Sequence, residues 1–211
     1  MFGMSDGPLE GFPLFPLDIV ALPTESVPLH IFEDRYRTMI ERCLEEHQEF
    51  GIVWMAEDEL KGVGCACAID RVLERTDDGR MNILARGTRP FRLLERQEHL
   101  PYPAGVVEFL DEHDPDTDPD VARTTRELYA QLVEQATDKT LSAEELDELG
   151  AYRMAATVEF GADAKQELLE LRSETARLHL LTMLFRAALK RMELVERAQT
   201  RARSNGKVRF G

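Results

Sequence analysis

The chain of 211 residues contains only three cysteines and one tryptophan, and it has no uninterrupted apolar run long enough to cross a membrane. Cys65 and Cys67 are too close together to suggest a disulfide-stapled domain, so we expect reduced thiols. The most apolar window, LHLLTMLFRAALKRM, is interrupted by Arg186 and Lys190, well short of roughly 20 residues. The first residues lack the basic start and apolar stretch that are typical of a signal peptide. These absences predict a cytoplasmic protein that has no membrane partner.

Basic residues are scarce as well. The chain has 26 lysines and arginines against 40 acidic residues, which gives a net charge of −14. Nucleic-acid binding depends on clustered positive charge, so nucleic acid is not expected as a partner. The local exception is a group of arginines on one predicted hairpin arm: Arg80, Arg86, Arg89, Arg92 and Arg96. With 43% hydrophobic and 31% charged residues, the composition is typical of a globular protein.

Motifs that carry enzyme chemistry are missing. The sequence contains no GxxxxGK[ST], HExxH or GxSxG, and no recognisable serine–lysine site. Cys65-x-Cys67 lacks the CxxC spacing or added histidines of a zinc site, and on a strand both side chains point to one face, as core residues do. We therefore expect no catalytic residue, no cofactor and no metal ion, which means that the protein is not an enzyme.

The pattern of apolar residues predicts an α+β fold. We expect a short strand from Leu17 to Leu22 and a helix over about residues 33–46, whose apolar positions recur at three- and four-residue steps. Short strands follow up to about Leu110, with a type I′ hairpin turn at Asp78-Gly79 and a kink at Gly87. Many short antiparallel strands with such kinks favour a β barrel.

The second half of the chain predicts helices. The acidic segment DEHDPDTDPD is typical of a linker, so we expect a β-barrel domain over residues 1–115 and a helical domain over 116–211. Asp118 is expected to cap the first of four helices, and Ser142 with Glu145 a second one that runs to about Phe160. Asp163 with Gln166 resembles a further capping box. Ser173 is expected to cap the last and longest helix.

Four blocks of sequence carry a family resemblance. FPLFPLDIVALP, VPLHIFEDRYRTMI, FGIV and VGCACAIDRVLERTDDGRMNILARGTRPFRLLE follow one another within residues 12–96. Together they resemble the N-terminal substrate-recognition domain of Lon proteases, in the stand-alone form that lacks the ATPase and peptidase modules. The resemblance implies a PUA-like antiparallel β barrel followed by a C-terminal four-helix bundle. It also implies a non-catalytic module that binds unfolded or tagged polypeptides, with a separate protease as a further potential partner.

Candidate peptide contacts come from these blocks. They are Pro16, Pro28, His30, Phe32, Arg35, Tyr36, Arg86, Gly87, Arg89 and Phe91. Irregular strand edges can accept an extended peptide by strand addition, and an apolar groove can hold its side chains. For His30 two interpretations stay open: a polar contact at the mouth of a groove, or a buried imidazole bonded to backbone, which is the commoner case.

Other functions remain open at this point. The resembling barrel is related to PUA domains that bind RNA, and the arginine arm is the sequence feature that supports RNA binding. An adaptor that holds a client with the barrel and docks a separate protease with the helices is a second alternative. A hydrolase that acts without ATP is a third.

Overall fold

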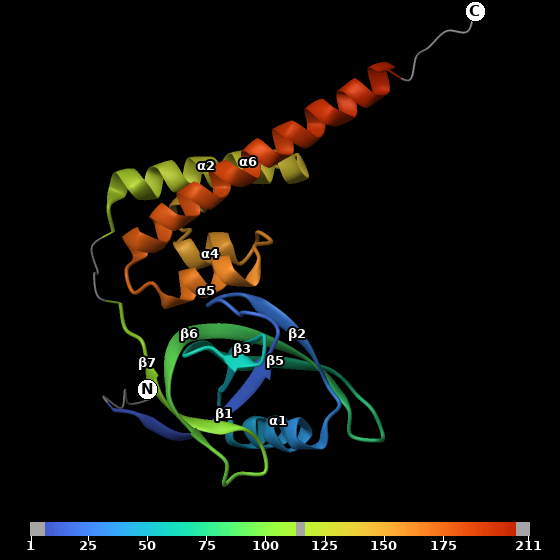
Figure 1. The fold of residues 1–211 in the computed structure, drawn as a ribbon, viewed down its shortest axis with the longest axis vertical. Helices are drawn as coiled ribbons and strands as arrows, with labels where there is room; N and C mark the ends of the chain where they lie inside the picture. The colour runs from blue at the N-terminus through green and yellow to red at the C-terminus, as the bar shows by residue number, and fades with distance from the viewer. Residues whose placement is uncertain (1–6, 113–116, 206–211) are drawn as a thin grey trace, which may run out of the picture. The chain divides into compact units, whose positions relative to one another are not determined.

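The computed structural model describes residues 7–112 and 117–205 (Figure 1). By its internal contacts the described chain divides into two compact units. The barrel unit comprises residues 7–112 and 152–172, and the helical unit comprises residues 117–151 and 173–205. The chain thus enters the helical unit twice. The domain boundary expected between residues 115 and 116 lies outside the described residues and stays a prediction.

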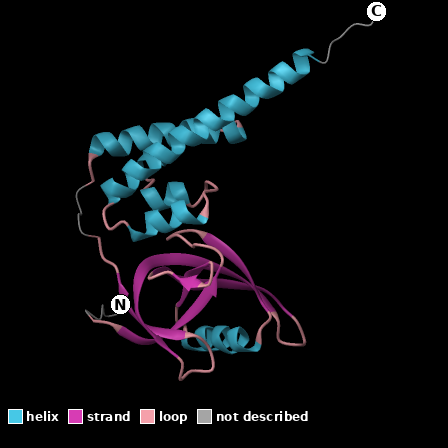
Figure 2. Cartoon of the chain, viewed as in Figure 1, coloured by secondary structure: helices cyan, strands magenta, loops and turns pink. Residues whose placement is uncertain are grey.

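The barrel unit contains a closed sheet. Its elements are β1 (Leu9–Leu17), β2 (Ser26–Ile31), α1 (Asp34–Glu46), β3 (Phe50–Ala56), β4 (Glu59–Leu60), β5 (Val63–Arg75), β6 (Met81–Gln97) and β7 (Ala104–Phe109). The strand order is β1-β7-β6-β5-β3-β4, with β2 paired to β6. A parallel pairing of β1 with β3 joins the two sides of this path into a ring, while the other pairings are antiparallel. Figure 2 shows the strands curving around a common interior. The predicted barrel is confirmed.

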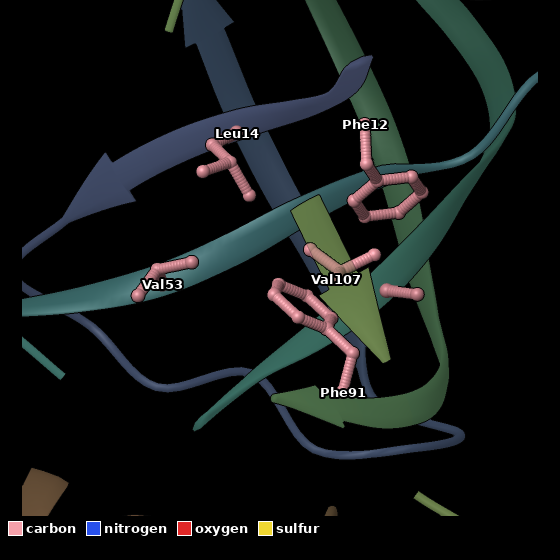
Figure 3. Close-up of a cluster of buried hydrophobic side chains, with 6 residues drawn as sticks. Phe12, Leu14, Val53, Phe91 and Val107 are labelled. Atoms are coloured by element: carbon pink, nitrogen blue, oxygen red, sulfur yellow. The ribbon is translucent and has the colours of Figure 1, made fainter. Parts of the chain in front are cut away.

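Apolar side chains from five strands fill the barrel (Figure 3). The cluster consists of Phe12, Leu14, Val53, Ala66, Phe91 and Val107, each no more than 2% exposed. The rings of Phe12 and Phe91 meet edge to face at 5.4 Å between centroids. Gly64 leaves the space that Phe91 occupies, because a Cβ there would lie 2.7 Å from the ring and 2.7 Å from the Ile52 carbonyl oxygen. Backbone and side chains are therefore close-packed at this point.

The predicted helix over residues 33–46 is confirmed as α1. Its apolar positions Tyr36, Met39, Ile40 and Cys43 are all buried. The ring of Tyr36 packs against that of Phe15 on β1, with 4.2 Å between centroids. This contact joins α1 to the barrel, so that side chains at the start of the helix are held on a rigid support.

The strand expected from Leu17 to Leu22 is wrong. β1 ends at Leu17, and the residues from Val20 to Leu22 form a buried loop. Buried backbone needs hydrogen-bond partners, which a strand ladder would normally supply. Here the Leu22 N–H donates to the Glu25 carboxylate at 2.9 Å, and the Leu22 carbonyl oxygen lies against Gly87. A Cβ on Gly87 would approach that oxygen to 2.1 Å, so only glycine fits there.

The hairpin between β5 and β6 lies where it was predicted, but the type I′ turn is wrong. The Gly79 N–H donates to the Thr76 carbonyl, and the Thr76 N–H donates to the Arg80 carbonyl, both at 2.9 Å. Gly79 has a positive φ of 82°, whereas Asp78 does not. This is a type I turn followed by a left-handed glycine, the usual three-residue hairpin loop. The Asp78 carboxylate favours it by accepting hydrogen bonds from Thr76 and Arg80.

Five helices follow the strands within the described residues. They are α2 (Pro119–Thr137), α3 (Ala143–Asp147), α4 (Ala151–Ala155), α5 (Ala162–Glu170) and α6 (Glu174–Asn205). Asp118 caps α2 by accepting from the backbone of Asp120 and Val121, and Ser142 forms the predicted capping box with Glu145. Ser173 accepts the Ala176 N–H at 3.3 Å and so caps α6. The α+β fold, an antiparallel barrel followed by helices, is confirmed.

The helix predicted from Ser142 to Phe160 is interrupted. α3 ends at Asp147, and α4 begins at Ala151 after Gly150. Partners from elsewhere in the helical unit stabilise the break: the Leu149 carbonyl accepts from Arg126 at 3.1 Å, and the Ala151 N–H donates to Glu174 at 2.6 Å. Both backbone groups are therefore satisfied without a continuous helix.

The capping box expected at Asp163 and Gln166 is wrong. Gly161 is the N-cap of α5, and no side chain caps this helix. Gln166 instead donates to the Val63 carbonyl at 3.1 Å and to Glu170 at 2.7 Å. With the ion pair between Lys165 and Glu25, this contact attaches α5 to the strands of the barrel unit.

One seam between α2 and α6 holds the helical unit together. Tyr129 and Phe185 contact each other with 5.7 Å between ring centroids. The Thr125 hydroxyl group is buried in the same seam, 3.1 Å from the Leu178 carbonyl oxygen and 2.8 Å from the Thr182 hydroxyl. No helix in the described part of the chain combines the length and apolar character that a membrane crossing requires.

Candidate functional site

A groove on the barrel unit brings together three of the predicted contacts: Pro16, Arg35 and Tyr36. It has a volume of about 460 Å³ and is formed by β1, the start of α1, the β3–β4 hairpin and the connection from β6 to β7. We call it the Tyr36 groove. Its lining consists of Leu14, Pro16, Arg35, Tyr36, Met55, Leu60, Arg96, Gln97, Glu98, Leu100, Pro101, Tyr102, Pro103 and Ala104. Apolar side chains and polar or charged ones thus both line the groove, as in sites that bind organic ligands.

Tyr36 supplies the groove with a hydroxyl group that is accessible to solvent, although most of its side chain is buried. Its side chain is only 6% exposed, held between Phe15 and the Arg35 guanidinium group, which lies 4.6 Å from the ring centroid. Within the described residues its hydroxyl group has no hydrogen-bond partner. Burial raises the pKa of Tyr36 above its ordinary value, so the hydroxyl stays protonated at neutral pH. The groove therefore contains a hydrogen-bond donor that is free to bind a ligand.

The charged groups of the groove differ in how they are paired. Arg35 binds Glu33, with 2.9 Å between its Nη2 and a carboxylate oxygen. Arg96, near the end of β6, has no carboxylate within 4.0 Å among the residues that the structure describes. Tyr102 is fixed by Arg42, whose Nη1 donates to the Tyr102 hydroxyl at 3.0 Å. Arg96 is thus a positive charge available to a ligand.

A second hollow, of about 590 Å³, contains Pro28 and His30. We call it the His30 surface; it is lined by Pro28, Leu29, His30, Leu73, Glu74, Asn82 and Ile83. Asn82 donates through Nδ2 to Glu74 at 2.7 Å, so its Oδ1 is the acceptor for His30 Nδ1 at 2.6 Å. This chain of bonds places the proton of a neutral His30 on Nδ1 and leaves Nε2 as an acceptor.

The expectation that His30 is a buried imidazole bonded to backbone is wrong. Along β2 the side chains alternate: Val27, Leu29 and Ile31 are buried, while Pro28 and His30 are exposed. The His30 ring stacks on Phe32, with 5.6 Å between centroids, and Phe32 is itself 58% exposed. An apolar aromatic ring is thus presented to solvent beside a polar one.

One edge of β2 has no strand partner in the described structure, since β2 pairs only with β6. The Gly87 N–H donates to the Glu25 carbonyl, so the pair of Ser26 with Arg86 is of the non-hydrogen-bonded kind. Alternation then directs the backbone groups of Ser26, Pro28 and His30 to the open edge. Pro28 has no N–H, so an added strand would find donors only at Ser26 and His30.

The other predicted contacts lie outside both surfaces. Arg86 pairs with Asp70, and Arg89 pairs with Glu49 at 3.2 Å while its guanidinium group lies 3.5 Å from the Phe109 ring centroid. Gly87 packs against Leu22, as described above, and Phe91 is 0% exposed in the barrel core. Phe91 thus has no surface with which to contact a partner in this structure.

The arginine arm is interrupted and largely neutralised. Register shifts between β5 and β6 and between β6 and β7 break the side-chain alternation that would align the arginines on one face. Ion pairs join Arg80 to Asp78, Arg86 to Asp70, Arg89 to Glu49 and Arg92 to Glu108. The positive charge that RNA phosphates would need is therefore mostly paired within the barrel unit.

Sequence reasoning missed the second wall of the Tyr36 groove, which includes Arg96, Leu100 and Tyr102. One signal for it was present: proline alternates with aromatic residues in PYP at 101–103, as it does in FPLFP at 12–16. Among the described residues, no group of three or more histidine, cysteine, aspartate or glutamate side chains is arranged to hold a metal ion. Cys43, Cys65 and Cys67 are free and buried, which confirms them as core residues.

Comparison with known proteins gives one family and a shared fold. The model of the ATP-dependent protease La (LON) substrate-binding domain matches residues 11–186. A Lon N-terminal domain protein from Xanthomonas campestris is 24% identical with a TM-score of 0.64, over 82% of this chain and 97% of that one. The N-terminal domain of the Mycobacterium avium complex Lon protease is 20% identical with a TM-score of 0.63, over 83% and 98% of the two chains. The protein belongs to the LON substrate-binding domain family.

Proposed function

We propose that this protein is a non-catalytic module that binds unfolded or tagged polypeptides in the Tyr36 groove. The observation that carries the proposal is a groove with both apolar and polar side chains and a tyrosine hydroxyl that has no partner within the described residues, in a member of the LON substrate-binding domain family. An extended polypeptide offers what such a groove binds: apolar side chains for Leu60 and Leu100, and backbone carbonyls for the Tyr36 hydroxyl.

Binding of this kind is weak and tolerant of sequence. The groove has a volume of about 460 Å³ and is open to solvent, so it accommodates only a few residues of a chain at a time. Ordering an unfolded segment costs conformational entropy, which offsets much of the favourable contact energy. We expect dissociation constants in the micromolar range, which correspond to a binding free energy of about −8 kcal/mol.

The His30 surface is a second contact in this proposal. The open edge of β2 and the exposed ring of Phe32 suit an extended segment that adds to the sheet. Because Pro28 removes one donor from that edge, the edge binds a strand less strongly than a regular one would. This favours transient binding of many segments over permanent pairing with one.

The proposal is tested by titrating a fluorescently labelled, permanently unfolded polypeptide with the full chain and measuring anisotropy. Leu100→Asp places a carboxylate in the groove, and we expect it to weaken binding at least tenfold. Leu94→Asp is the matched control, because Leu94 is 48% exposed and lies in neither surface. Circular dichroism checks that both variants are folded.

Two results would contradict the proposal. One is equal loss of affinity in the two leucine variants, and the other is no binding by the folded wild-type chain. A structured RNA is titrated in parallel at two salt concentrations. Tight RNA binding that weakens steeply with salt would favour the RNA-binding alternative. A separate protease as a partner stays a prediction.

A further inference from the structure

The Tyr36 groove contains two unused hydrogen-bond donors on one lining. Within the described residues, the Tyr36 hydroxyl has no hydrogen-bond partner and Arg96 has no carboxylate partner. Tyr36 is 6% exposed as a residue, but its hydroxyl oxygen is still accessible to solvent, so a ligand can reach it. Other nearby donors are occupied, since Arg35 binds Glu33 and Arg42 binds Tyr102. Glu98 on the same lining is likewise without a cation partner among the described residues.

We propose that the groove selects polypeptide segments that carry a carboxylate group among apolar residues. This inference rests on the proposed function and adds a preference to it. A carboxylate accepts hydrogen bonds at two oxygens and donates none, so it suits a lining that offers a guanidinium group and a phenolic hydroxyl group. A neutral amide of the same shape brings donors of its own and no charge, so it fits this pair less well.

The rest of the lining defines the surroundings of that carboxylate. Met55, Leu60 and Leu100 provide apolar contacts on the same groove. Side chains that flank the acidic group can therefore be apolar, and their burial supplies the sequence-tolerant part of the affinity. The acidic group supplies the selective part.

The charge of the whole protein limits how acidic the ligand can be. With a net charge of −14, the protein repels highly acidic segments at long range. Glu98 lies on the same groove and acts in the same direction at short range. A single carboxylate in an apolar context is favoured over an acidic run and over a doubly charged phosphate group.

The inference is tested with pairs of labelled peptides that differ in one group. The first pair is an apolar peptide with one glutamate and the same peptide with glutamine at that position. The second pair is neutral within the chain and carries either a free or an amidated C-terminus, so that side-chain and terminal carboxylates are distinguished. A third comparison replaces the glutamate by phosphoserine.

We expect the wild-type chain to bind one carboxylate peptide about tenfold more tightly than its amide partner, as charge-assisted hydrogen bonds of this kind allow. Arg96→Gln and Tyr36→Phe should each reduce this ratio toward one; the second keeps the ring that packs on Phe15. Arg92→Gln is the matched control, because Arg92 lies on the same strand, pairs with Glu108 and does not line the groove.

Failure of the inference is distinguishable from failure of the proposed function. Equal binding of both members of each pair, with affinity still lost in Leu100→Asp, would overturn the carboxylate preference and leave polypeptide binding intact. Absence of binding to every peptide would overturn both. Preference for phosphoserine over glutamate, or a ratio unchanged in Arg96→Gln, would also overturn the inference.

Discussion

The two units of this protein bury their apolar residues in different ways. The barrel closes on itself through the pairing of β1 with β3, and the ring of Phe91 is fully enclosed. The helical unit depends on one seam between α2 and α6, and beyond Leu189 the apolar side chains Leu194 and Val195 of α6 are 57% and 50% exposed. A closed barrel provides rigid walls for grooves, whereas a two-helix seam provides a stable contact along part of its length.

The units also differ in their buried polar groups. Thr125 and Arg177 are fully buried in the helical unit, where Arg177 pairs with Glu174 at 2.9 Å. The cluster at the centre of the barrel is entirely apolar. The seam of the helical unit therefore owes more of its specificity to hydrogen bonds, and the barrel owes more of its stability to packing.

Core truncation gives the largest expected effect and tests whether the units are separate. Phe91→Ala leaves a cavity in the barrel and should lower the free energy of unfolding by about 3–5 kcal/mol. Phe185→Ala, equally buried in the helical seam, is its matched counterpart. Trp54 is the chain's one tryptophan and lies in β3, so its fluorescence reports the barrel, while circular dichroism at 222 nm reports mainly the helices.

The urea midpoint from Trp54 fluorescence should therefore fall mainly in Phe91→Ala, and the midpoint at 222 nm mainly in Phe185→Ala. Each variant serves as the control for the other. If both variants shifted both signals equally, the two units would unfold as one, and they would not differ in stability as proposed.

Breaking the buried ion pair comes next. Glu174→Ala leaves Arg177, which is 1% exposed, without this carboxylate, and it also removes the acceptor for the Ala151 N–H. We expect a loss of about 3 kcal/mol in the 222 nm transition, because removing one partner of a buried ion pair is costly. Glu193→Ala removes the exposed pair with Arg197 on the same helix and should change stability by less than about 0.5 kcal/mol. Similar losses in the two variants would show that burial does not govern the strength of these pairs.

Alkaline pH acts on the barrel unit, which contains all three cysteines. Burial raises the pKa of Cys43 from 9.0 to about 12, so the unfolded chain loses this proton before the folded one. The stability contributed by the neutral thiol is complete below pH 9 and is lost as the pH rises from 9 toward 12. The slope is about 1.4 kcal/mol per pH unit for one thiol.

Urea titrations at pH 8, 9 and 10, followed by Trp54 fluorescence, measure that slope. Cys43→Ala is less stable at every pH because of the lost packing. Between pH 9 and 10, however, its free energy of unfolding should fall less steeply with pH than that of the wild type, by the contribution of about one thiol proton. Identical slopes in the variant and the wild type would exclude Cys43 as the titrating group.

Local signals explain which parts of this comparison could be predicted from the sequence. α1, the Asp118 cap and the Ser142 capping box depend on residues within a few positions of each other, and all were predicted correctly. The break at Gly150 depends on Arg126 and Glu174, which lie more than 20 residues away, so the local pattern wrongly favoured a continuous helix.

The same distinction applies to the candidate site. Pro16, Arg35 and Tyr36 belong to neighbouring blocks of sequence, and their meeting in one groove follows from the short path between β1 and α1. Arg96 and Leu100 join them only because the barrel closes through non-local strand pairing. One sequence contains no local pattern from which that closure could be derived, so the second wall of the groove was not predicted.

The smallest effect is expected at the exposed end of α6, where the helical unit leaves apolar side chains uncovered, unlike the closed barrel. Leu194 is 57% exposed, so Leu194→Ala removes little buried area and should change the 222 nm transition by less than about 0.5 kcal/mol. Leu189→Ala, only five positions earlier on the same helix but 9% exposed, should cost about 2–3 kcal/mol. The helical seam ends between these two residues if the difference is found. A cost at Leu194 as large as that at Leu189 would mean that another surface covers this end of α6 in solution, because exposed leucines contribute little to stability unless they become buried.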